Sequence, residues 1–119
     1  MKLNYITIMV RDLEKSIDFY QNLVGLHVVR RFQPNDADIA FLNNHDDETM
    51  LELIQIDNAK KVSTEGMVMS FCAGTQLTQM REKAIALGYQ PTEIIDHQPK
   101  PRYFRLNDPD GIVVEFSIE

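Results

Sequence analysis

The sequence predicts an α+β fold built from two copies of one βαβββ module. The first observation is a repeat: Glu52 and Glu115 are related by a fixed offset (115 − 52 = 63), each inside a short apolar run, MLELIQI and GIVVEFSI. The second is that Gly25 and Gly88 keep the same spacing, each after a segment with helical periodicity. Two copies are too few for a solenoid, so we expect two similar modules, 3–56 and 66–119, within a single domain that spans residues 1–119.

The first module has the stronger signals. Asp12 is placed to cap a helix over residues 13–24, and Gly25 is placed to end it. Apolar residues follow the helical period in LEKSIDFYQNLV and alternate in the flanking segments. The predicted strands of this module cover residues 3–10, 27–33, 37–42 and 50–56.

The second module predicts the same order of elements. Thr75 is the expected cap of a helix through LTQMREKAIAL, and Gly88 ends that helix. A polar linker at 57–65 joins the modules, DHQPKPR forms a proline-rich loop, and DPDG makes a tight turn into the last strand. Phe41 and Phe104 repeat at the same offset as the glutamates. The predicted strands of this module cover residues 67–73, 91–96, 102–107 and 112–118.

Charge and cysteine content limit the possible partners and compartment. The net charge is −6, with 12 basic and 18 acidic residues and no run of Lys or Arg longer than a pair, which argues against nucleic-acid binding. The single cysteine, Cys72, excludes an intramolecular disulfide, suits a reducing compartment and is expected to be buried in its strand. Arg11 and Asp12 interrupt the N-terminal apolar segment too early for a signal peptide or a membrane span, so a cytoplasmic protein is expected.

The repeat, with VRDLEKSIDFYQNLVGL near the start and NDPDGIVVEF at the end, resembles the vicinal oxygen chelate superfamily. That superfamily includes glyoxalase I, bleomycin-resistance proteins, fosfomycin-resistance enzymes and extradiol dioxygenases. The resemblance implies that the modules form a curled mixed sheet shaped as a cup, the glyoxalase/bleomycin-resistance/dioxygenase fold. It also implies a homodimer that binds a small molecule.

The resemblance further implies four metal-ligand positions, which correspond here to Tyr5, Glu52, Val68 and Glu115. Valine has no donor atom, and tyrosine is an uncommon ligand for hard divalent ions. The site is therefore incomplete, and no tightly bound cofactor is expected, although Glu52 and Glu115 with waters still suit Mg²⁺ or Mn²⁺. None of the three histidines occupies a matching position, and only His97 lies in a loop that could reach into the cup.

Alternation along the strands predicts which other side chains face the cup. Phe104 and Leu106 are expected in the core on the helix side, which puts Arg105 on the cup face, one strand from Glu115. The predicted ligand-binding residues are Tyr5, Thr7, Met9, Val68, Ser70, Tyr103 and Arg105.

Three interpretations of the two glutamates follow from the cost of burying an unpaired carboxylate. They are structural pairs, with Arg105 satisfying Glu115; or both hold a divalent metal; or Glu52 or Glu115 acts without metal as a catalytic base or ligand acceptor. The favoured function is a family protein that binds a small molecule in the cup. The alternative is a divalent-metal-dependent lyase of the lactoylglutathione lyase type that uses Glu52 and Glu115.

Overall fold

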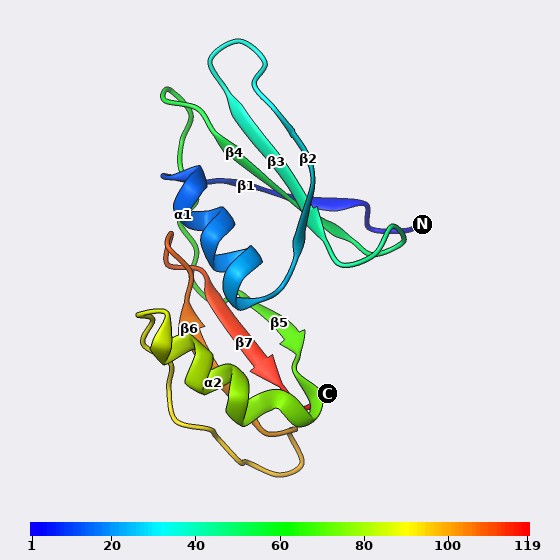
Figure 1. Cartoon of the computed structure of the whole chain (residues 1–119), viewed down its shortest axis with the longest axis vertical. Coiled ribbons are helices and arrows are strands. Elements are labelled where there is room, and N and C mark those ends of the chain that lie inside the picture. The colour runs from blue at the N-terminus through cyan, green and yellow to red at the C-terminus, as the bar shows by residue number, and fades with distance from the viewer. The chain divides into compact units, whose positions relative to one another are not determined.

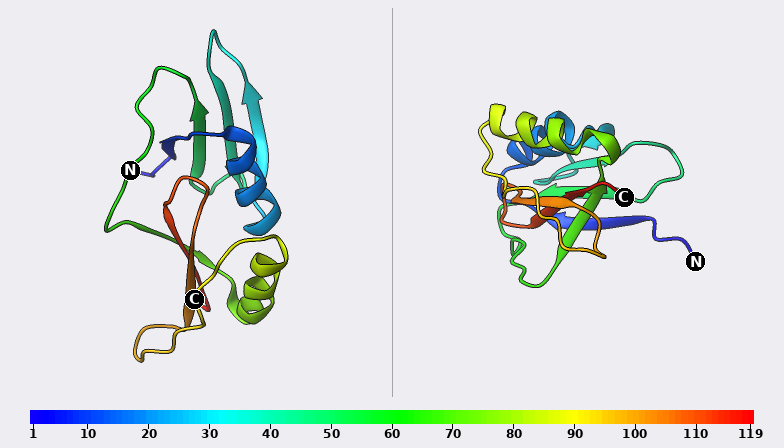
Figure 2. Two further views of the ribbon diagram at one scale, coloured as in Figure 1. Left: turned by 90° about the vertical axis from the view of Figure 1, so that its left-hand side faces the viewer. Right: turned by 90° about the horizontal axis from the view of Figure 1, so that it is seen from below.

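The computed structural model describes all 119 residues and contains seven strands and two α-helices. The chain divides into two compact units, residues 1–63 and 64–119, and each unit has its own mixed sheet (Figure 1). Within each unit one helical segment covers one face of the sheet (Figure 2). The predicted α+β class is confirmed.

The first unit has the four strands that the sequence predicts. They are β1 (Tyr5–Met9), β2 (His27–Phe32), β3 (Asp38–Asn43) and β4 (Met50–Gln55). Their order across the sheet is β1-β4-β3-β2, with β1 parallel to β4 and the other pairs antiparallel. Because β1 and β4 are parallel, the chain has to cross over between them, and the first helix begins that crossover.

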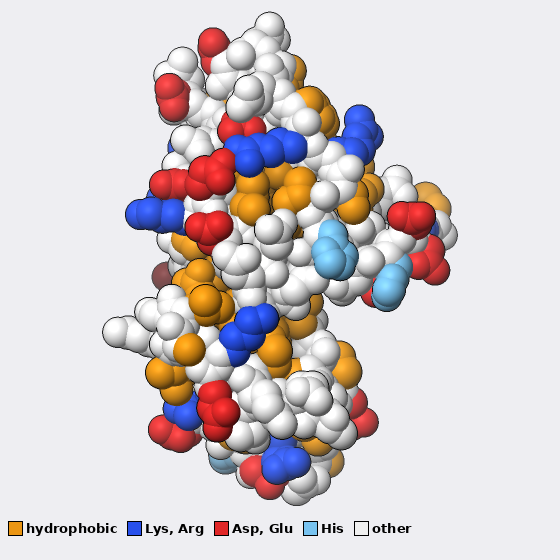
Figure 3. Space-filling view, in the orientation of Figure 1, with side chains coloured by type: hydrophobic (Ala, Val, Ile, Leu, Met, Phe, Trp, Pro, Cys, Tyr) orange, Lys and Arg blue, Asp and Glu red, His pale blue; other side chains and the backbone are white.

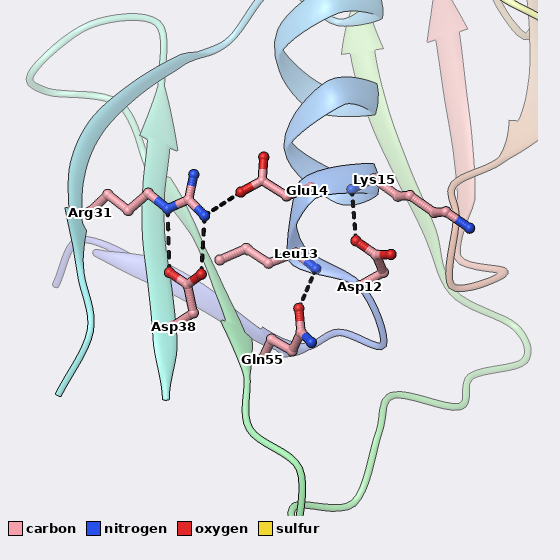
Figure 4. A network of polar contacts seen from close by, with 7 residues as sticks. All are labelled: Asp12, Leu13, Glu14, Lys15, Arg31, Asp38 and Gln55. Atoms are coloured by element: carbon pink, nitrogen blue, oxygen red, sulfur yellow. Dashed lines mark hydrogen bonds and ion pairs between the residues drawn. The ribbon is translucent and has the colours of Figure 1, made fainter. Parts of the chain in front are cut away.

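The first helix starts at the predicted cap. The carboxylate of Asp12 accepts a hydrogen bond from the Lys15 backbone N–H at 3.1 Å, and α1 covers Leu13–Ile17. The N–H of Leu13, which has no acceptor within the helix, donates to Gln55 Oε1 on β4 at 2.7 Å (Figure 4). This bond satisfies one of the unpaired donors at the helix start and fixes α1 to the end of the sheet.

The helix widens after its first turns. Residues Asp18–Leu23 form a π-helical segment, and the N–H of Val24 donates to the carbonyl of Phe19, five residues back. The extra residue in this turn rotates the buried face by about one position. Leu23 is therefore in the core and Val24 only half-buried, where regular α-helical spacing would have buried Val24.

Ion pairs join the first helix to the edge strand β2, and β2 to its neighbour β3. Arg31 on β2 donates to both carboxylate oxygens of Asp38 on β3, at 3.3 and 3.0 Å, and also pairs with Glu14 on α1 (Figure 4). The two carboxylates raise the pKa of Arg31, and the guanidinium holds the pKa of Asp38 below its usual value. In the space-filling view, acidic and basic side chains lie next to one another on the part of the surface that the first unit forms (Figure 3).

The second unit has three regular strands, not four. They are β5 (Val68–Cys72), β6 (Tyr103–Asn107) and β7 (Val113–Ser117), in the order β5-β7-β6, with β5 parallel to β7 and β6 antiparallel to it. The predicted strand at 91–96 is replaced by an irregular segment with a single bridge between Ile95 and Tyr103.

Local chemistry accounts for the missing strand. Pro91 has no N–H to donate, and the hydroxyl of Thr92 accepts the hydrogen bond of the Arg105 N–H at 3.0 Å, which would otherwise serve a backbone carbonyl. The Thr92 N–H still donates to the Arg105 carbonyl at 2.8 Å. The segment therefore follows the edge of β6 without forming a regular ladder.

The second helix begins differently from the prediction. A 3₁₀ turn, Gly74–Gln76, leads into α2, Leu77–Ala86, so Thr75 lies inside the turn and does not cap the helix. Gly88 ends the helix as predicted, with a positive φ of 93° that a glycine adopts at little cost. No helix of the protein is both long enough and apolar enough to cross a membrane.

Arg81 on α2 fixes the irregular segment in place. Its Nε donates to the Thr92 carbonyl at 2.8 Å, and Nη2 lies 3.2 Å from Glu93 Oε1. We expect Arg81→Gln to lower the free energy of unfolding by about 1 kcal/mol, the usual contribution of such a bond. Amide hydrogen exchange at 92–95 should become faster, whereas Lys83→Gln on the same helix should change neither quantity. Unchanged exchange at 92–95 would contradict this role.

Candidate functional site: the helix-free sheet faces

Glu115 lies on the central strand of the second sheet, on the face away from α2. Its neighbours in register are Ser70 on β5 and Arg105 on β6. The turn at DPDG sets the start of β7, because Asp108 Oδ1 accepts the N–H groups of Asp110 at 2.8 Å and Ile112 at 2.9 Å. The Glu115 side chain is only 6% exposed, so its charge needs partners.

Three side chains supply those partners. Ser70 Oγ donates to Glu115 Oε2 at 2.8 Å. Arg105 places Nε and Nη2 each 3.1 Å from Oε1, and Lys100 Nζ lies 3.4 Å from the same oxygen. The prediction that an Arg105 guanidinium lies beside Glu115 is confirmed, although both of its contacts go to one oxygen.

The balance of these contacts fixes the charge of Glu115. Burial alone would raise its pKa, but hydrogen bonds from Ser70 and Arg105 and the charges of Lys100 and Arg105 outweigh that effect. The pKa of Glu115 is therefore below its ordinary value. A carboxylate with a lowered pKa is a weak proton acceptor at neutral pH, which disfavours Glu115 as a catalytic base.

Tyr103 lies beside this cluster, as alternation along β6 predicts. Lys100 Nζ is 4.6 Å and the Arg105 guanidinium carbon 5.0 Å from the centroid of its ring. Phe104 and Leu106 are buried on the opposite face, as expected. Sequence reasoning missed Lys100, because it belongs to the irregular proline-rich loop, where no periodicity indicates the direction of a side chain.

Glu52 occupies the corresponding position in the first sheet but has different neighbours. Thr7 on β1 is its register partner and donates Oγ1 to Glu52 Oε1 at 2.5 Å. On its other side in register lies Phe41, whose ring meets that of Tyr5 edge-on at 5.3 Å. Glu52 is half-buried and forms no ion pair within the chain.

Two further residues belong to this face of the first sheet. The Arg30 guanidinium lies 5.5 Å from the ring centroid of Phe32 and 5.6 Å from that of Phe41. The sequence contains a signal for them, since Arg30 and Phe32 alternate along β2 in register with β3. The bulge between Val28 and Arg30 shifts this register, and the shift is not visible in the sequence.

The two sheets differ by one position in register at the strand beside the glutamate. Phe41 pairs with Glu52, whereas Arg105, and not Phe104, pairs with Glu115. The offset between the modules is therefore larger by one at this strand (105 − 41 = 64) than at the glutamates (115 − 52 = 63). The prediction that Phe41 and Phe104 are equivalent is wrong, because the second module has one more residue before β6.

The remaining predicted residues lie at the outer edges of the sheets. Tyr5 and Val68 are exposed, and Met9 is half-buried. Cys72 is also exposed, contrary to prediction, because β5 is an edge strand. All three histidines, including His97, are exposed.

The donor set does not fit the metal site that the resemblance implies. Nowhere do three His, Cys, Asp or Glu side chains gather to hold a metal ion. Val68 offers no donor atom, and Glu115 Oε1 is already surrounded by the nitrogens of Arg105 and Lys100. Two positive charges at that oxygen oppose a divalent cation.

The fold agrees with the comparison to known proteins. The protein-family model of the Glyoxalase/Bleomycin resistance protein/Dioxygenase superfamily matches residues 2–116. The chain therefore belongs to this superfamily.

Individual relatives share limited sequence identity with this chain. An uncharacterized protein, YwbC of Bacillus subtilis (strain 168), is 29% identical over 97% of this chain and 95% of its own length. Lactoylglutathione lyase of Neisseria meningitidis (serogroup A, strain Z2491) is 40% identical, but only over 57 residues, 44% of this chain and 41% of that enzyme. TnmS3, an antibiotic binding protein from Streptomyces sp. CB03234, has the same fold, with a TM-score of 0.78 and 19% identity over 98% of this chain and 94% of its own.

Proposed function

We propose that this protein binds a small organic molecule on the helix-free faces of its sheets, without the four-ligand metal site of metal-using relatives. The observation that carries the proposal is the environment of Glu115, which already accepts hydrogen bonds or ion pairs from Ser70, Arg105 and Lys100. A carboxylate so engaged is structural and leaves the surrounding surface for a ligand.

The chemistry of the faces supports binding. The first sheet presents the exposed ring of Tyr5, which lies edge-on to the buried ring of Phe41, and the second presents Tyr103 beside two cationic groups. Aromatic rings with a few polar groups are typical of surfaces that bind small molecules. The description of TnmS3 as an antibiotic binding protein is in keeping with this use of the fold.

A second candidate function is a divalent-metal-dependent lyase of the lactoylglutathione lyase type that uses Glu52 and Glu115. One observation favours it: Glu52 keeps its carboxylate free of ion pairs, with Thr7 as its hydrogen-bond donor. The partial match to the Neisseria enzyme is consistent with it. The occupied Glu115 counts against it.

Metal analysis and an activity assay separate the two candidates. Protein purified without chelator or affinity tag should hold far less than one zinc or nickel ion per chain, because its donors suit these metals poorly. Addition of Zn²⁺, Ni²⁺, Mn²⁺ or Mg²⁺ should not produce lactoylglutathione from methylglyoxal and glutathione. Stoichiometric metal would contradict the metal-free site, and metal-stimulated turnover that disappears in Glu52→Gln would establish the lyase instead.

A further inference from the structure

The cluster around Glu115 carries more positive than negative charge. Two cations, Lys100 and Arg105, face one carboxylate, and Ser70 and Tyr103 are neutral neighbours. The net charge of the cluster is therefore +1, on a protein whose total charge is −6. A local excess of this sign in an acidic protein selects against cationic ligands and in favour of anionic ones.

Both cations keep hydrogen-bond donors that Glu115 does not use. Arg105 directs Nε and Nη2 to Glu115 Oε1, which leaves the N–H groups of Nη1 without a partner within the chain. Lys100 has three N–H donors, and a single carboxylate oxygen faces it. The Arg105 and Lys100 side chains are 38% and 44% exposed, so these donors are accessible.

The cations are also held in fixed positions. Each contacts the ring of Tyr103 and each contacts Glu115, and Thr92 Oγ1 anchors the backbone N–H of Arg105. Held side chains lose less conformational entropy when they bind a ligand than free ones do. A planar guanidinium matches the geometry of a carboxylate or a phosphate group, with the ammonium adding a second point of charge.

We propose that Lys100 and Arg105 form a binding site for the anionic group, of the carboxylate or phosphate type, of the small molecule that this protein binds. The inference rests on the proposed function and gives the chemical class of its ligand. The first sheet has no equivalent cluster, because Phe41 stands where Arg105 stands in the second sheet, and Arg30 on that face lies against the rings of Phe32 and Phe41 and not in an ion pair with Glu52. The first sheet therefore serves as a comparison for the second sheet within the same chain.

Three probes of nearly the same shape and different charge test this site. Benzoate, benzamide and benzamidinium carry charges of −1, 0 and +1, and each is titrated into the ¹⁵N-labelled full chain at constant ionic strength. We expect benzoate to bind most tightly and benzamidinium most weakly, with the largest amide shifts at residues 70, 103–105 and 115. Phenyl phosphate, compared with benzoate, shows which type of anionic group the site prefers.

A variant with a matched control assigns the effect to the cation. Lys100→Gln should weaken benzoate binding about fivefold, as for a half-exposed ion pair, and leave benzamide binding unchanged. Lys60→Gln, at an exposed lysine of the linker, should change neither. Benzamide binding as tight as that of benzoate, or benzoate binding that is insensitive to Lys100→Gln, would overturn the anion site while leaving the proposed function intact. Absence of binding by all the probes to either sheet face would overturn both.

Discussion

Arg105→Met is expected to lower the free energy of unfolding at pH 7 by about 2–3 kcal/mol. The substitution leaves Glu115, whose side chain is 6% exposed, with Lys100 and Ser70 as its remaining partners. Removing one partner of a buried ion pair costs about 3–5 kcal/mol, and the partial exposure of Arg105 and the presence of Lys100 reduce that cost. Urea denaturation followed by circular dichroism measures the change.

The pH dependence of this loss identifies its cause. The folded-state pKa of Glu115 lies below the ordinary 4.5, so the cluster stabilises the protein fully above that pH and the stabilisation is lost as the pH falls through the folded pKa. In Arg105→Met the pKa of Glu115 rises, because burial is then less opposed. The difference between the variant and the wild type should therefore be largest above the Glu115 pKa of the variant and shrink as the pH falls from there toward the lower folded pKa of the wild type.

A double variant is the control for this prediction. Adding Glu115→Gln to Arg105→Met removes the poorly paired charge and should recover more than half of the lost stability, since an amide is cheaper to bury than a carboxylate. Lys100→Met, at a 44% exposed side chain, should cost less than about 1 kcal/mol. A loss from Arg105→Met that is independent of pH and is not recovered in the double variant would show that its alkyl chain, and not its charge, stabilises the fold.

The part of this cluster that lies on regular strands could be predicted from the sequence. Ser70, Arg105 and Glu115 lie in segments where apolar residues alternate, and alternation fixes the face of each side chain. The DPDG turn joins β6 to β7 and sets their antiparallel register, which brings Arg105 opposite Glu115. Thr7 and Glu52 are found by the same reasoning in the first sheet.

The part that depends on irregular backbone could not be predicted. Lys100 reaches Glu115 from a loop. The Thr92 hydroxyl accepts the Arg105 N–H in place of the backbone carbonyl that a regular strand would supply. The segment 91–96 contains two apolar residues, Ile94 and Ile95, and the sequence therefore predicts a strand there. Both are half-buried in the structure, but the segment makes only a single bridge to β6 and no regular ladder. The exposure of Cys72 likewise depends on which strand is at the edge, a property of strand order that alternation does not reveal.

Phe104→Ala is expected to lower the free energy of unfolding by about 3–5 kcal/mol, the usual cost of removing a fully buried phenylalanine. Phe104 has no exposed surface and stacks on Phe116 with ring centroids 5.2 Å apart. Its true counterpart in the first unit is Ala40, which pairs with Leu53 as Phe104 pairs with Phe116. An alanine at the same place suits the first core but would leave a cavity in the second.

Phe41→Ala is the matched control, and the comparison tests the change of register directly. Phe41 lies on the helix-free face and is 7% exposed, but its ring neighbours Tyr5 and Phe32 are exposed, so solvent can fill much of the space that its ring leaves. We expect a loss of about 1–2 kcal/mol, well below that of Phe104→Ala, because no closed cavity forms. Equal losses in the two variants would mean that both rings occupy one equivalent position, as a constant offset along the whole repeat implies. The predicted inequality follows only if one extra residue turns Phe104 into the core and Arg105 toward Glu115.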